Sequence, residues 1–114
     1  MTIVEKLLKN AYEDTQLLIG NDKKGDDFSL LRDIEFVMYA EDEKTATAVT
    51  GFINDNRYGK ASLEEAEERF RILVVINMPS TQHLVCSTSG LMSCIASIFS
   101  LEYDGWGCSI QNTK

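Results

Sequence analysis

The stretch Leu101-Glu102-Tyr103-Asp104-Gly105-Trp106-Gly107 lies near the C-terminus of the 114-residue chain and contains its single tryptophan. Its two glycines tolerate positive φ, so Asp-Gly followed by Trp-Gly predicts a bulge or tight turn that re-aims the neighbouring aromatic rings. Residues on both sides of the glycines alternate in polarity, as in a half-buried strand. We predict a final strand bent at these glycines, with Tyr103 and Trp106 packed in the core rather than forming a contact surface.

Helical periodicity predicts three helices. The first begins with a capping box, in which Thr2 caps the first turn and Glu5 reaches back to it. The second follows an acidic run, because negative charge is favoured at a helix N-terminus. The third follows Pro79, with Ser80 or Thr81 available as its cap. The predicted bounds are residues 3–19, with Gly20 ending the helix, 42–54 and 82–99.

Two further strands follow from β-type patterns. Alternation of Ile34, Phe36 and Met38 with their neighbours predicts a strand over residues 32–40, and a nearly continuous apolar run predicts a central strand over residues 70–78. Between them, Tyr58-Gly59-Lys60-Ala61 is a short edge-like segment. The acidic run Glu64-Glu65-Ala66-Glu67-Glu68 that follows fits either a solvated helical turn or a strand-connecting loop.

The order of these elements predicts the fold class. After the first helix the order is β-α-β-β-α-β, the split βαβ pattern of an antiparallel sheet with two helices on one face. We therefore expect an α+β, ferredoxin-like sandwich with an extra N-terminal helix. The chain length fits a single domain over residues 1–114.

Composition narrows the possible partners. The formal net charge of −7 repels phosphate backbones and argues against direct binding of nucleic acid. The same charge favours a basic protein partner, although an acidic surface that only keeps the protein soluble is the commoner interpretation. The apolar runs are too short to cross a bilayer, and the N-terminus lacks the layout of a signal peptide, so we expect a cytoplasmic protein.

Residues for catalysis or metal binding are sparse. The single histidine, His83, and Cys86 lie three residues apart, but no residue is identifiable to orient them as a catalytic pair. Cys86, Cys94 and Cys108 lack the close spacing of a metal site and are expected to be reduced thiols. We expect neither an enzyme nor a protein with a metal or other cofactor.

The motif Tyr103-Asp104-Gly105-Trp106-Gly107 resembles the Y-D-G-W-G signature of the RraB family, small protein inhibitors that bind the endoribonuclease RNase E. The resemblance runs over most of the chain. It implies a ferredoxin-like fold and a non-catalytic inhibitor that contacts a ribonuclease without a cofactor. An immunity protein that neutralises a toxin nuclease in an interbacterial contact-dependent inhibition system is the alternative, because both classes bury an acidic patch against a basic partner.

Two acidic groups are the candidates for binding a basic nuclease, either RNase E-like or a toxin domain. One is on the predicted loop before the central strand, and the other flanks Tyr103, with its two side chains on the same side if the last strand is regular. Exposed carboxylates of this kind accelerate association with a basic partner by electrostatic steering. The residues are Glu64, Glu65, Glu67 and Glu68 in the first group, and Glu102 and Asp104 in the second.

Overall fold

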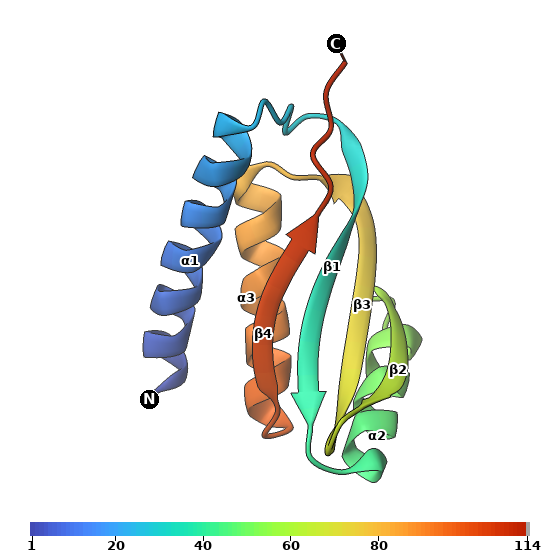
Figure 1. The fold of residues 1–114 in the computed structure, drawn as a ribbon. Helices are drawn as coiled ribbons and strands as arrows, with labels where there is room; N and C mark the ends of the chain where they lie inside the picture. The colour runs from blue at the N-terminus through green and yellow to red at the C-terminus, as the bar shows by residue number, and fades with distance from the viewer. Residues whose placement is uncertain (114) are drawn as a thin grey trace.

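Four antiparallel strands form the centre of the molecule, which the computed structural model describes over residues 1–113 (Figure 1). Strand β3 lies between β1 and β2, and β4 pairs with the other edge of β1, giving the order β2-β3-β1-β4. This confirms the predicted α+β architecture with a split βαβ arrangement. The elements are α1 (Ile3–Lys23), β1 (Leu31–Ala40), α2 (Glu43–Asp55), β2 (Lys60–Ala66), β3 (Arg69–Pro79), α3 (Gln82–Ile98) and β4 (Glu102–Cys108).

The core lies between one face of the sheet and helices α2 and α3. Ile34, Phe36 and Met38 of β1 are fully buried on this face, whereas the neighbouring Asp33 and Glu35 are exposed on the other. Successive strand residues point to opposite faces, so the alternation predicted for this strand is confirmed. The opposite face, which we call the outer face, carries the alternate strand residues, whose side chains point away from the helices.

A β-bulge bends β4 at the predicted place. Gly105 pairs with Val37 and Tyr103 with Met38, so Asp104 is an extra residue without a partner on β1. Gly105 has a φ of 93°, a conformation that favours glycine. The extra residue changes the parity of the strand, so that Tyr103 and Trp106 both point toward the helices. The predicted bend and the predicted core position of Trp106, which is 9% exposed, are confirmed.

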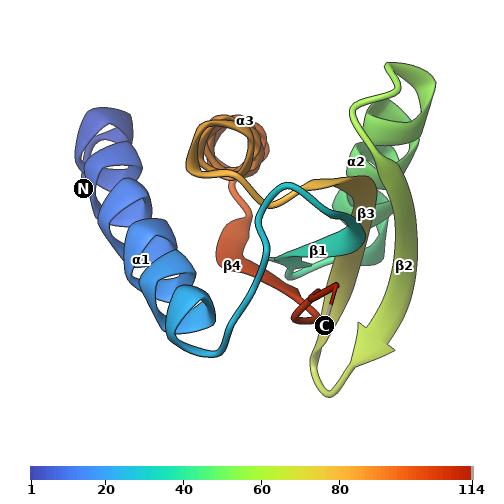
Figure 2. The ribbon, with the colours of Figure 1, turned by 90° about the horizontal axis from the view of Figure 1, so that it is seen from above.

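Helix α1 packs outside the main layer, against α3 on the side away from α2 (Figure 2). The capping box of Thr2 and Glu5 is present, but the helix continues through Gly20 to Lys23, so the predicted end at Gly20 is wrong. Leu18 is buried, whereas Val4, Leu8 and Ile19 of the predicted apolar stripe are exposed. An outer helix with one neighbouring helix buries a narrower stripe than a helix against a sheet, which explains these exposed side chains.

The acidic run before β3 divides between a strand and a turn. Glu64 and Glu65 lie in β2, opposite Arg71 and Phe70 of β3, so both sequence-based alternatives are wrong for these two residues. Pairing with β3 overrides their weak intrinsic preference for strand structure. The prediction of a strand-connecting loop holds for Glu67 and Glu68, which form the turn between β2 and β3.

Candidate protein-interaction surface

Three segments that carry acidic residues and are distant in the sequence meet at one end of the molecule, the lower end in Figure 1. The end of β1 pairs with the start of β3 and with the start of β4, which brings the β1–α2 connection, the β2–β3 turn and Glu102 together. Glu41 also lines a hollow of about 480 Å³ with Glu67, Glu68 and Arg69. We call this region the acidic end. Its exposed acidic members are Glu41, Asp42, Glu43, Glu64, Glu65, Glu67, Glu68 and Glu102.

Two arginines of the acidic end are paired within the protein. Arg69 forms an ion pair with Glu102 at 2.9 Å and lies over the ring of Tyr39, 3.7 Å from its centroid. Arg71 forms an ion pair with Glu64 at 2.5 Å. Within residues 1–113 the other carboxylates of the acidic end have no ion-pair partner. They therefore leave a net negative surface that is free to meet positive charge on another molecule.

The two predicted acidic groups are thus brought together in part. Glu102 joins the four glutamates of the first group at the acidic end, whereas exposed Asp104 lies further along β4, in the bulge. The expectation that Glu102 and Asp104 share one side assumed a regular strand, and that assumption is wrong. Glu41, Asp42 and Glu43 are not among the contact residues predicted from the sequence, which indicates only that their acidic run begins a helix.

The aromatic side chains of the motif point into the protein, where each makes a polar contact, and do not form an exposed surface. The indole Nε1 of Trp106 donates a hydrogen bond to Asp14 Oδ1 at 3.0 Å, and the Tyr103 and Ser89 hydroxyls are 2.7 Å apart. Burial raises the pKa of Asp14, against the opposing effect of hydrogen bonding by Ser89 and Trp106. Asp14 Oδ2 is buried with no hydrogen-bond partner among the described residues. The motif therefore joins α1, α3 and β4.

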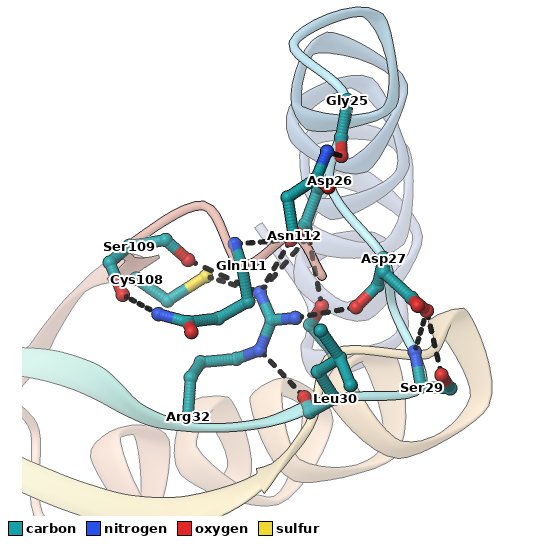
Figure 3. Close-up of polar contacts among 11 residues, drawn as sticks. Gly25, Asp26, Asp27, Ser29, Leu30, Arg32, Cys108, Ser109, Gln111 and Asn112 are labelled. Atoms are coloured by element: carbon teal, nitrogen blue, oxygen red, sulfur yellow. Dashed lines mark hydrogen bonds and ion pairs between the residues drawn. The ribbon is translucent and has the colours of Figure 1, made fainter. Parts of the chain in front are cut away.

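A buried ion pair that the sequence did not suggest holds the C-terminal segment in place (Figure 3). Arg32 Nη1 donates to both carboxylate oxygens of Asp26, at 2.9 and 3.0 Å, and both side chains are at most 1% exposed. Asp26 also accepts bonds from the Ser80 hydroxyl and the Gln111 backbone N–H. Arg32 donates further to the Asp27, Leu30 and Ser109 carbonyls. These bonds satisfy both charges, so the cluster is structural.

The only sequence signal for this ion pair was the position of Arg32 on the core parity of β1, two residues before Ile34. The same cluster explains why Ser80 does not cap α3. Thr81 is the N-cap residue but makes no side-chain capping bond, while the Ser80 hydroxyl donates to Asp26 instead.

The surroundings of Cys86 do not activate its thiol. Burial raises the pKa of Cys86, and the nearby charge of Asp14 raises it further. A nucleophilic cysteine needs the opposite shift, since the thiolate is the reactive form. His83 is exposed at the start of α3. Over residues 1–113 no group of three or more His, Cys, Asp or Glu side chains is placed to hold a metal ion.

None of the helices in the described part of the chain is both long and apolar enough to span a membrane.

Comparison with protein families identifies the chain. The sequence model of a family described as Regulator of ribonuclease activity B, or RraB, matches residues 11–108. The match begins within α1 and ends at the last residue of β4, so it includes the whole sheet. The chain belongs to the RraB family. Its RraB membership confirms the resemblance seen in the Tyr103–Gly107 motif. A search of curated proteins found no significant match.

RraB membership indicates that the functional site is a protein-binding surface. The description of the RraB family is that of a regulator of ribonuclease activity, which implies a protein partner. The RraB match contains every strand, both predicted acidic groups and the whole acidic end.

Proposed function

We propose that this RraB protein binds a ribonuclease through its acidic end and lowers the activity of that ribonuclease by blocking access to its active site. The observation that carries the proposal is the gathering of Glu41, Glu65, Glu67 and Glu68, exposed and without ion pairs among the described residues, at one end of an RraB fold. Ribonucleases bind a polyanion and therefore present positive charge around their active sites. An acidic surface of this kind competes with RNA for those positively charged side chains.

The protein acts as a binding partner and not as a catalyst in this proposal. The raised pKa of the Cys86 thiol argues against a thiol nucleophile. Asp14 is buried where α1, α3 and β4 meet, so its role is structural. Electrostatic steering sets the rate of association, while desolvated contacts at the centre of the interface set the rate of dissociation. The complex forms in the cytoplasm and requires no cofactor.

RNase E is the ribonuclease that the family resemblance implies, and it is the first target to test. A toxin nuclease would be bound by the same physics, so the immunity-protein alternative is separated by which nuclease is inhibited. A complex with RNase E of the same organism supports the regulator, and a complex with a cognate toxin domain supports the alternative.

The experiment measures association rates with RNase E by stopped flow at about 0.02 M and about 0.15 M salt, where the Debye length falls to about 8 Å. Two double charge reversals are compared, Glu67→Lys with Glu68→Lys at the acidic end, and Glu13→Lys with Asp22→Lys on α1 as a control of equal charge change. At low salt we expect the first pair to slow association about tenfold or more and the control pair to have a much smaller effect.

A third variant, Glu102→Lys with Asp104→Lys, maps the extent of the contact. If this variant slows association less than Glu67→Lys with Glu68→Lys does, the contact is centred on the β2–β3 turn. Equal slowing by the acidic-end and control pairs would show that net charge matters and the acidic end does not.

A further inference from the structure

The outer face of the sheet is bare along β4. Gly107 lies opposite Glu35 and Gly105 opposite Val37, both on the parity that points away from the helices. Edge strand β4 therefore presents main chain, without side chains, at two consecutive outer positions. Glycine inside a strand costs conformational entropy and often marks a place where another backbone approaches closely.

Gly105 and Gly107 differ in what the fold requires of them. Gly105 needs its positive φ for the bulge, whereas the φ of Gly107 lies outside that range. A Cβ placed on Gly107 would meet no heavy atom within 4 Å, and the residue is exposed. Nothing within the described protein explains a glycine at this position, so its lack of a side chain points to a contact with another molecule.

A hollow of about 580 Å³ adjoins Gly107 and is acidic. Asp33 and Glu35 line one side of it, and Ser109 and Gln111 of the C-terminal segment line another. The Glu35 carboxylate has no hydrogen-bond or ion-pair partner among the described side chains, and the Asp33 carboxylate accepts a single bond, from Asn77 Nδ2 at 3.0 Å. Arg32 also borders the hollow, but its guanidinium is buried against Asp26, as Figure 3 shows, and does not neutralise these carboxylates.

Aliphatic side chains continue from the hollow across the outer face. Val75 lies opposite Glu35, and Val37 lies opposite Leu73. All three are partly exposed. Lysine and arginine side chains pack their methylene stems on apolar surface while their charged ends reach an acceptor. The outer face thus offers an apolar surface for the methylene stem of a basic side chain and carboxylates for its charged end.

We propose that this hollow receives an arginine or lysine side chain of the partner ribonuclease, whose main chain lies against Gly107. The proposal rests on the proposed function and adds a second contact, on the outer face, to the acidic end. A carboxylate pair suits a guanidinium, which donates two parallel bonds to a carboxylate. The same pair repels phosphate, so a basic protein segment fits the hollow and RNA does not.

The test uses Gly107→Thr, which adds a β-branched side chain over the hollow at a position where the fold has space. Binding of RNase E from the same organism is measured by calorimetry, and the melting temperature is measured in parallel. We expect affinity to fall about tenfold or more, the range of an interface hot spot, with an unchanged or higher melting temperature. Gly51→Ala on α2, where an added Cβ also meets nothing within 4 Å, is the matched control and should bind normally.

A second variant keeps the proposal testable if Gly107→Thr fails to fold. Glu35→Gln removes one carboxylate without changing shape and should weaken binding about fivefold or more, while Glu13→Gln on α1 should not. Normal binding by both outer-face variants, with binding still weakened by the acidic-end reversals, would overturn the outer-face contact and leave the proposed function standing. Wild-type protein that binds no RNase E would overturn both. If the wild type binds an RNA oligonucleotide and Gly107→Thr abolishes that binding, the hollow is a site for RNA and not for a basic protein segment.

Discussion

The bond between Trp106 and Asp14 gives a direct test of how the Tyr103–Gly107 motif stabilises the fold. Trp106→Phe keeps a large apolar ring at the core position but removes the indole N–H that donates to Asp14 Oδ1 at 3.0 Å. Because Asp14 Oδ2 already has no partner among the described residues, the variant also removes the bond that Oδ1 accepts from the indole.

The expected cost combines a hydrogen bond and a small cavity. Loss of a hydrogen bond to a buried charged group costs about 1.5–3 kcal/mol. The smaller ring leaves about 40 Å³ less filled volume, which adds about 1 kcal/mol. The free energy of unfolding should therefore fall by about 2.5–4 kcal/mol, and the melting temperature by about 10–15 °C for a chain of this length.

Chemical denaturation of the wild type, Trp106→Phe, Asp14→Asn and the double variant measures the coupling between the two side chains. We expect a coupling free energy of about 1 kcal/mol or more, because the second substitution removes a bond that the first has already broken. A coupling free energy below about 0.5 kcal/mol, with additive single effects, would show that the bond contributes nothing beyond the packing of the ring.

Three further predictions follow from the buried polar groups and from the bulge. Because burial raises the folded-state pKa of Asp14 above 3.8, its stability contribution is fully present below about pH 3.8 and is lost as the pH rises through the raised pKa. The free energy of unfolding of the wild type should thus fall relative to Asp14→Asn as the pH is raised from about 4 toward neutrality, and parallel pH profiles would contradict this. Arg32→Met leaves the Asp26 charge buried and should cost about 3–5 kcal/mol in urea denaturation, whereas a loss below about 1 kcal/mol would refute the structural role of the pair. Gly105→Ala should cost about 1–2 kcal/mol for its positive φ while Gly107→Ala costs nothing, and equal melting temperatures for the two variants would contradict the assigned bulge.

Prediction from sequence worked where one local pattern determined the result. The parity of Ile34, Phe36 and Met38 placed β1 with one face in the core, and the glycines of the motif marked the bend in β4. Thr2 and Glu5 fixed the start of α1 because a capping box depends on residues three apart. In each case the physical cause lies within a few residues of its signal.

Prediction failed where the cause lies far away in the chain. Glu64 and Glu65 join a strand because β3 is there to pair with them, and no local propensity indicates that partner. Helix α1 passes Gly20 because Asn21, in its last turn, is buried and its carbonyl accepts bonds from the Lys24 and Asp26 N–H groups. The acidic end arises from the sheet order, which brings Glu41 and Glu102 to one end although their positions in the sequence are far apart.

Inhibition of a ribonuclease by contact with this RraB protein is measured by the cleavage rate of RNase E on a labelled RNA as the protein is titrated. We predict that the rate falls in proportion to added protein and levels off near one protein per active site. Glu67→Lys with Glu68→Lys should require much more protein for the same effect at physiological salt, and Glu13→Lys with Asp22→Lys should match the wild type. A cleavage rate that is unchanged at a large excess of the wild-type protein would contradict inhibition of this enzyme by contact.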